Sequence, residues 1–84
     1  MSIIYKGAYG KKVKIKEGLE KVFDNYDNEV DKSKVFLVTQ YIDREDEIVG
    51  IYPLEEGGLT ESELLSVQYK KHEVFCDQLE YANE

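Results

Sequence analysis

The amino-acid sequence predicts a mainly β fold, a small α+β domain with an antiparallel five-stranded sheet and one or two short helices. Lys11 to Lys16 alternates apolar and charged side chains with the period of a half-buried strand. Lys34 to Ile42 is rich in β-branched and aromatic residues, and a second such run ends at Pro53. The 84 residues are enough for one modest core, so we expect a single domain over residues 1–84.

The N-terminal half adds a further strand and a helix to this pattern. Ser2 to Lys6 contains a short apolar run that we expect to form a strand. A turn should follow at Gly7 to Gly10, because both glycines can adopt positive φ without strain. From Leu19 to Tyr26 the apolar residues fall at helical spacing, which predicts a short helix. The polar stretch from Asp27 to Lys34 is expected to be a loop.

The two apolar runs in the middle of the chain predict a hairpin. The charged stretch Asp43 to Asp46 between them is short enough to form the turn. The returning strand should span Glu47 to Pro53. Gly50 within it is typical of a β-bulge, and the proline is typical of a strand end or an edge strand.

The C-terminal third fits two patterns. Thr60 and Glu63 have the spacing of a capping box at the start of a helix. Five residues then continue a helical stripe: Leu65, Tyr69, His72, Cys76 and Leu79. The segment from Leu65 to Tyr69 also alternates with the period of a strand. In that case residues 57–64 would form a tight turn or one turn of 3₁₀-helix ahead of a closing strand.

The order of a long hairpin, a charged Gly-Gly turn, a short helical turn and a last strand resembles the end of an SH3-like small barrel. The resemblance covers residues 34–71 and is at the level of the fold alone. It implies that the sheet curls into a small barrel closed by the strand at Leu65 to Tyr69. The alternative is an antiparallel sheet with one face covered by a long C-terminal helix.

Residues that carry metal or catalytic chemistry are sparse. Cys76 is the one cysteine and His72 the one histidine, so a metal site lacks the three or four ligands that it needs. A Cys–His nucleophile would also need an orienting group and an oxyanion site. We therefore expect no cofactor, no metal and no enzymatic activity, with Cys76 in the core and His72 at the surface.

Charge is distributed unevenly along the chain. Residues 1–21 carry six lysines against two glutamates, whereas residues 22–84 carry sixteen acidic and five basic residues. The net charge of −7 opposes binding to nucleic acid and to anionic membranes. The absence of a signal-peptide pattern and of paired cysteines predicts a cytoplasmic protein, present as a monomer or a small homodimer.

Seven tyrosines and the density of carboxylates after Phe23 indicate a protein-interaction module. We expect a small regulator or inhibitor that docks on a basic surface of a partner protein, a nucleic-acid-binding surface being one example. DNA mimics and the host-takeover or anti-defence proteins of bacteriophages are the class that it generally resembles, without a shared motif. The expected partner-binding residues are eight acids and three tyrosines: Asp43, Glu45, Asp46, Glu47, Glu55, Glu56, Glu61, Glu63, Tyr41, Tyr52 and Tyr69.

An alternative from another class is a small barrel that binds single-stranded nucleic acid through its basic N-terminal strand. Tyrosines among lysines can stack on bases while the lysines neutralise phosphates. The residues expected at such a site are Lys6, Tyr9, Lys11, Lys12, Lys14 and Lys16. This alternative requires the acidic residues to lie on the opposite face of the domain.

Overall fold

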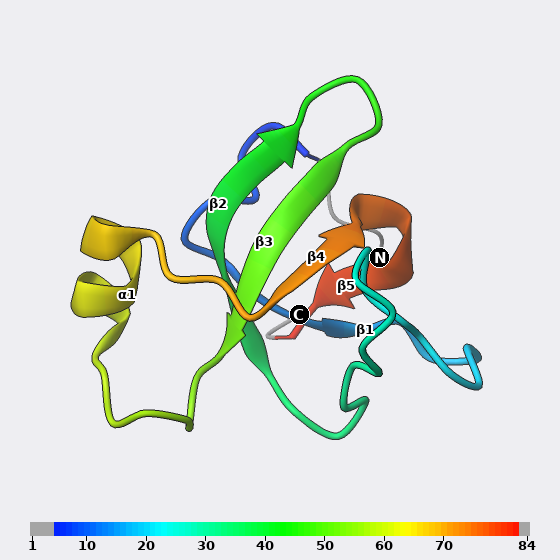
Figure 1. Cartoon of the computed structure of the whole chain (residues 1–84), viewed down its shortest axis with the longest axis horizontal. Helices are drawn as coiled ribbons and strands as arrows, with labels where there is room; N and C mark the ends of the chain where they lie inside the picture. The colour runs from blue at the N-terminus through cyan, green and yellow to red at the C-terminus, as the bar shows by residue number, and fades with distance from the viewer. Residues whose placement is uncertain (1–4, 83–84) are drawn as a thin grey trace.

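A five-stranded sheet forms the centre of the fold, with α1 beside it (Figure 1). The computed structural model describes residues 5–82. The elements, in chain order, are β1 (Lys12–Ile15), β2 (Phe36–Asp43), β3 (Ile48–Pro53), α1 (Glu61–Val67), β4 (His72–Phe75), the 3₁₀-helix η1 (Cys76–Gln78) and β5 (Leu79–Tyr81). The predicted fold class, a mainly β antiparallel five-stranded sheet with short helices, is confirmed.

The strands lie in the order β4-β3-β2-β1-β5, and each neighbouring pair is antiparallel. Strand β1 lies between β2 and β5, so that Val13 is opposite Phe36 on one side and Tyr81 on the other. In Figure 1, the chain of β1 emerges from behind the lower part of the upright β2–β3 hairpin, and β5 lies to the right of the hairpin. The sheet is therefore strongly coiled, and its concave face can enclose a core.

The core is built from alternate residues of all five strands, together with residues of the connections. Its buried members are Ala8, Val13, Ile15, Val22, Val30, Phe36, Val38, Val49, Ile51, Val74, Cys76 and Leu79. Val22 and Val30 come from the long connection between β1 and β2. This connection is thus held by its apolar side chains although it contains no helix.

The first half of strand β2, from Phe36 to Thr39, is buried on both faces. Phe36 and Val38 belong to the core, whereas Leu37 and Thr39 alternate with them and are also fully buried. Helix α1, with its buried Leu64, packs against β2, and Thr39 Oγ1 donates a hydrogen bond to the carbonyl oxygen of Tyr69. Burial on both faces explains why this strand reads as a nearly continuous apolar run.

Only the end of the strand expected at Ser2 to Lys6 falls within the described residues. Residues 2–4 lie outside the described residues, and Tyr5 and Lys6 belong to a bend and a turn. The turn expected after them is present, with φ of 101° at Gly7 and 80° at Gly10. The strand expected at Lys11 to Lys16 is β1.

The prediction of a helix from Leu19 to Tyr26 is wrong. The connection from β1 to β2 has an irregular backbone there. Val22 and Val30 point into the core and are joined by a backbone hydrogen bond of 2.8 Å, from Val30 N–H to Val22 O. Between them, the Asp24 side chain accepts two backbone N–H groups. Such bonds offer the backbone an alternative to the helix and so override the helical spacing.

Both interpretations of the C-terminal third are wrong in part. The capping box of Thr60 and Glu63 is present, but α1 has seven residues and its C-cap is Gln68, with φ of 53°. Residues 72–75 then pair with β3 as β4, which excludes a long C-terminal helix. Without β4, the apolar strand β3 would be an unpaired edge, and this pairing outweighs the weak helical pattern.

The element order expected from the SH3-like resemblance is displaced toward the C-terminus. Residues 65–69 are not the closing strand; the short helical turn is η1 and the last strand is β5. The sheet is open, since within residues 5–82 β4 pairs with β3 alone and β5 with β1 alone. The irregularity expected at Gly50 lies in the opposite strand, where the register shifts between Val38 and Gln40.

In the part of the chain that the structure describes, no helix has the length and apolar character needed to cross a bilayer.

Gly50 marks the place where the chain after α1 crosses the sheet. A Cβ atom added there would lie 3.1 Å from Cβ of Lys70 and 3.3 Å from Cβ of Gln40. We expect Gly50→Ala to lower the free energy of unfolding by about 1–3 kcal/mol, the usual cost of overpacking. Urea denaturation measures this, with the exposed Ser66→Ala as a control that should change little. An unchanged midpoint in Gly50→Ala would show that the crossing segment moves away without cost.

Candidate functional site

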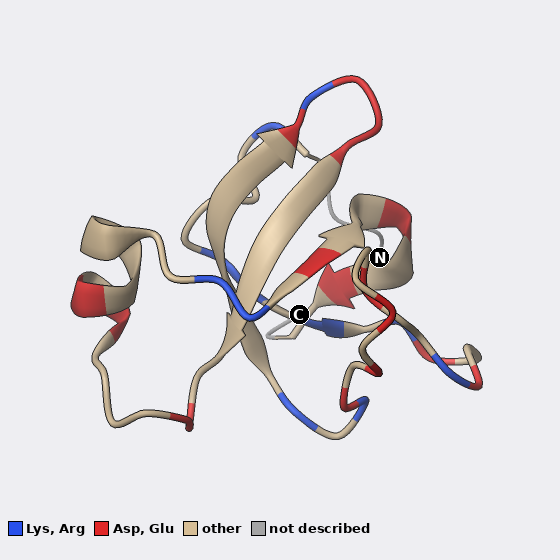
Figure 2. Cartoon of the chain, in the orientation of Figure 1, with Lys and Arg blue, Asp and Glu red and all other residues tan. Residues whose placement is uncertain are grey.

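The predicted acidic residues fall into two groups at opposite ends of strand β3. The first group precedes the strand, in the β2–β3 loop: Asp43, Glu45, Asp46 and Glu47. The second group follows it, in the connection to α1 and in α1 itself: Glu55, Glu56, Glu61 and Glu63. Figure 2 shows the acidic β2–β3 loop at the top of the hairpin and the acidic part of α1 at the far left of the view. The structure therefore does not bring the eight carboxylates onto one surface.

The acids of the β2–β3 loop differ in role. Asp43 Oδ1 accepts the backbone N–H groups of Glu45 and Asp46 at 2.9 and 3.0 Å, so Asp43 shapes the turn. Glu45, Asp46 and Glu47 are exposed and form no ion pair with the described residues. These three carboxylates are therefore available to a partner.

Most acids of the second group stabilise the fold. Glu56 bridges Lys34 at 3.0 Å and Lys71 at 2.8 Å, and the hydrogen bonds from these ammonium groups lower its pKa. Glu61 lies 3.6 Å from Lys12. Glu63 accepts the backbone N–H and the hydroxyl of its N-cap residue, and these bonds lower its pKa.

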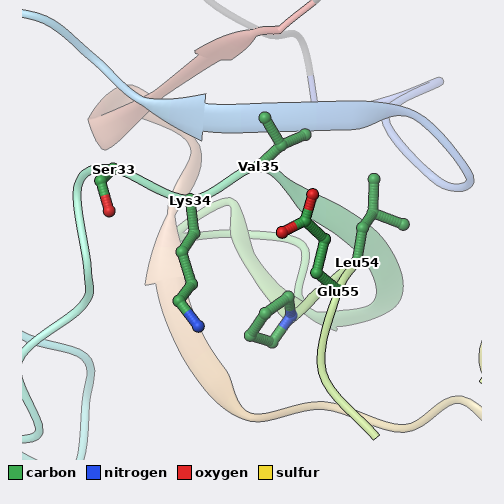
Figure 3. Close-up of a pocket in the computed structure, with 6 residues that line it drawn as sticks. Ser33, Lys34, Val35, Leu54 and Glu55 are labelled. Atoms are coloured by element: carbon green, nitrogen blue, oxygen red, sulfur yellow. The ribbon is translucent and has the colours of Figure 1, made fainter. Parts of the chain in front are cut away.

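Glu55 lies at the open end of the β2–β3 hairpin. A pocket of about 310 Å³ is lined there by Ser33, Lys34, Val35, Pro53, Leu54 and Glu55. Figure 3 shows the side chains of Lys34 and Glu55 extending into the space between these two segments. The pocket thus presents one cation and one anion on an apolar surface.

The three predicted tyrosines occupy two separate places. The Tyr41 hydroxyl oxygen accepts the backbone N–H groups of Gly7 and Tyr9, both at 3.0 Å. Its ring centroid lies 4.6 Å from that of Tyr5. Tyr41 therefore fastens the N-terminal turn to β2. Tyr52 and Tyr69 form a second pair, with ring centroids 6.4 Å apart.

A shallow groove runs along α1 beside Tyr69. It has a volume of about 280 Å³ and we call its lining the α1 face: Leu59, Ser62, Glu63, Ser66, Val67 and Tyr69. Val67 is 55% exposed and Tyr69 is 49% exposed. Large apolar side chains are thus displayed next to the carboxylate of Glu63.

The basic N-terminal strand is partly neutralised by acids that lie beside it. Lys12 is paired with Glu61, and Lys14 lies 3.5 Å from Glu80 and 4.0 Å from Glu17. Tyr9 donates its hydroxyl hydrogen to the carbonyl oxygen of Leu65 at 3.0 Å. The residues expected to bind nucleic acid are therefore not all free to do so.

A buried hydrogen-bonded pair of polar side chains was missed by the sequence analysis. His72 was expected at the surface, but it is only 6% exposed, and its Nδ1 lies 2.6 Å from Oδ2 of Asp24, which is 4% exposed. Asp24 Oδ1 accepts the backbone N–H groups of Tyr26 at 2.8 Å and Asn28 at 3.0 Å. The two residues are 48 positions apart, and nothing in the sequence pattern connects them.

The environment keeps Asp24 ionised. Burial raises its pKa, but the hydrogen bonds from His72 and from two backbone N–H groups outweigh burial, so that the pKa is lowered. His72 can donate from Nδ1 both as the neutral ring and as the imidazolium, so the bond to Asp24 survives in either form.

Glu73, a buried residue of β4, also connects the same loop to the sheet. It accepts hydrogen bonds from the Lys70 ammonium and, at 2.8 Å, from the Tyr26 hydroxyl, and these bonds lower its pKa against the effect of burial. Its carbonyl oxygen accepts the backbone N–H of Asn25 at 3.0 Å. The tip of the β1–β2 connection is thus fixed to β4 by the buried bond of His72 and by the part-buried bonds of Glu73.

Cys76 is buried in the core, as expected, and burial raises the pKa of its thiol to about 11. Residues 5–82 contain no group of three His, Cys, Asp or Glu side chains arranged to hold a metal ion.

No known protein family, curated protein or solved structure matches this chain.

Asp24→Asn tests the buried pair. The carboxylate accepts three donors, and an amide nitrogen in place of one oxygen would face a donor. We expect the free energy of unfolding at pH 7 to fall by about 1–3 kcal/mol. Because the pKa of Asp24 is lowered in the folded state, its contribution is present above the unfolded value of about 3.9 and is lost as pH falls through the folded value. The difference between wild type and variant should therefore shrink below about pH 4.

Denaturant titrations between pH 3 and pH 7 measure this dependence. The exposed Asp27→Asn is the matched control, since its left-handed φ of 64° suits asparagine equally well. Equal stability of Asp24→Asn and wild type at pH 7 would contradict the role of the pair.

The Cys76 thiol should be inert in the folded protein. A thiol that is buried, with a pKa of about 11, has little thiolate at pH 8. We expect iodoacetamide to label Cys76 only after unfolding in guanidinium chloride, as followed by mass spectrometry. Rapid labelling without denaturant would show that η1 opens in the native state.

Proposed function

We propose that this chain is a small non-catalytic protein-interaction module, a regulator or inhibitor that docks on a basic partner protein. The observation that carries the proposal is the display of Val67 and Tyr69 on a groove beside Glu63. Exposed apolar side chains with a polar rim are characteristic of protein interaction sites. Tyrosine is also among the residues that dominate binding energy at interfaces.

The charge of the chain supports a basic partner. The net charge is −7, and the β2–β3 loop contributes three carboxylates that have no ion pair among the described residues. Charges of this kind accelerate the encounter with an oppositely charged surface more than they prolong the complex. We therefore infer that the β2–β3 loop speeds association with the partner, whereas the α1 face slows dissociation.

The alternative of single-stranded nucleic-acid binding has less support. Two of the lysines on β1, Lys12 and Lys14, already have carboxylate partners. Phosphate groups would have to displace these carboxylates, in a chain whose net charge repels them.

The two surfaces should affect binding kinetics differently. The triple variant Glu45→Gln, Asp46→Asn, Glu47→Gln should slow association and weaken its salt dependence. Tyr69→Ala should instead speed dissociation by about 5–30-fold, the equivalent of 1–2 kcal/mol at an interface. Biolayer interferometry measures both, against a partner captured from the source cells by the wild-type protein and then purified.

The matched control for charge is Glu17→Gln, Glu20→Gln, Glu29→Gln, which removes three exposed carboxylates elsewhere. It should bind much like wild type. If Tyr69→Ala and the loop variant both bind as wild type does, the docking surface lies elsewhere and the proposal is wrong. Loss of binding on neutralising Lys11, Lys12 and Lys14 would favour nucleic acid instead.

A further inference from the structure

The groove on the α1 face combines apolar side chains with a single charge. Leu59, Val67 and Tyr69 are its large apolar members, and Glu63 is the one charged residue among the described residues that line it. Its volume of about 280 Å³ is room for about nine water molecules at roughly 30 Å³ each. That is enough space for one extended side chain of a partner protein. The charge of the lining opposes an anionic group and favours a cationic one.

The Glu63 carboxylate has one oxygen free for a ligand. Its Oε1 accepts the backbone N–H and the hydroxyl of Thr60 at 3.1 and 3.0 Å, and these bonds lower its pKa. Its Oε2 has no hydrogen-bond donor among residues 5–82. The capping box therefore holds an ionised carboxylate in a fixed position, with one oxygen still able to accept hydrogen bonds.

The lysines around α1 are already bound to other carboxylates. Lys70 and Lys71, which follow the groove in the chain, are each paired with a glutamate elsewhere. Lys12 is bound by Glu61, which lies two residues before Glu63 and therefore on the other side of the helix. A cation for this groove must come from another molecule, and the basic partner proposed above would supply it.

The backbone of Tyr69 is fixed although its side chain is half exposed. Its N–H donates to the carbonyl oxygen of Leu64 at 3.2 Å, and its own carbonyl oxygen accepts the Thr39 hydroxyl. The ring of Tyr52 lies beside it, with centroids 6.4 Å apart. An aromatic side chain whose backbone is already ordered loses less conformational entropy when a ligand binds.

The apolar lining distinguishes between the two permanently charged basic side chains. The lysine ammonium is a compact, strongly hydrated point charge, and apolar walls do not replace its water. The arginine guanidinium is more weakly hydrated, stacks on an aromatic ring and donates to a carboxylate oxygen at the same time. Its methylene groups can also pack on apolar side chains such as Val67. A tyrosine ring beside a carboxylate therefore favours arginine.

We propose that the α1 face binds an arginine side chain of the partner, with the guanidinium between the Tyr69 ring and the Glu63 carboxylate. The stem of the arginine lies against Leu59 and Val67. The inference rests on the proposed function, because the partner supplies the arginine. The groove itself is tested without the partner.

The test is an NMR titration of the whole chain with acetyl-arginine amide. Acetyl-lysine amide and acetyl-citrulline amide are the matched probes at equal ionic strength, since citrulline has the shape of arginine without its charge. One exposed ion pair and one cation–π contact bind weakly, so shifts are compared at a fixed probe concentration. We expect the arginine probe to shift the Tyr69 ring and the amides of residues 62–67 several-fold more than either of the other probes.

Variants of the groove separate a site from general charge attraction. Glu63→Gln removes the charge but keeps the capping box, because glutamine also serves at this position. It should reduce the arginine shift to that of citrulline. Tyr69→Leu should remove the preference for arginine over lysine. Glu20→Gln removes an exposed carboxylate outside the groove and should respond as wild type does.

The arginine site is overturned if the lysine or citrulline probe shifts the Tyr69 ring as much as arginine does. Shifts spread over the whole surface, or a wild-type response of Glu63→Gln, would also overturn it. These results would leave the docking surface standing, because that surface is judged by the dissociation of Tyr69→Ala from the partner. Selective arginine shifts together with wild-type dissociation of Tyr69→Ala would support the arginine site and overturn the docking surface.

Discussion

The burial of the first half of β2 on both faces is the constraint on which the rest of the structure depends. The inner face of Phe36 and Val38 is covered by the coiled sheet, but Leu37 and Thr39 require a second cover. Helix α1 and the segment after it supply that cover, which explains why a helix is inserted between β3 and β4. The outer side of the same insertion carries Val67 and Tyr69. The proposed docking surface is therefore a consequence of how the central strand is protected from water.

The β1–β2 connection contains no helix or named strand, and hydrogen bonds of buried polar side chains hold it in place. Val22 and Val30 supply apolar burial, but the tip between them is held to β4 by Asp24 and His72. A buried pair of this kind gives the loop one defined position, because removing either partner leaves the other without compensation. The same pair fixes the orientation of the imidazole. One interaction thus sets the position of both the loop and the imidazole ring.

The elements that could be predicted are those whose signals are local. The alternation in β1, the β-forming residues of β2 and β3, the glycine turn and the capping box of Thr60 all act within a few residues. Strand β4 and the Asp24–His72 pair could not be predicted, because their partners are remote in the chain. The same reason applies to the acids, since no local pattern shows that Glu56 bridges two lysines whereas Glu45 bridges none.

The Tyr41 hydroxyl oxygen acts as the hydrogen-bond acceptor that a backbone carbonyl would provide in a paired strand. By accepting two backbone N–H groups, from Gly7 and Tyr9, it holds the N-terminal turn without a ladder of strand bonds. Phenylalanine has the same ring but no acceptor, so at this position the two aromatic residues are not interchangeable. In related chains the first turn and position 41 should therefore vary together, with tyrosine retained wherever this turn is retained.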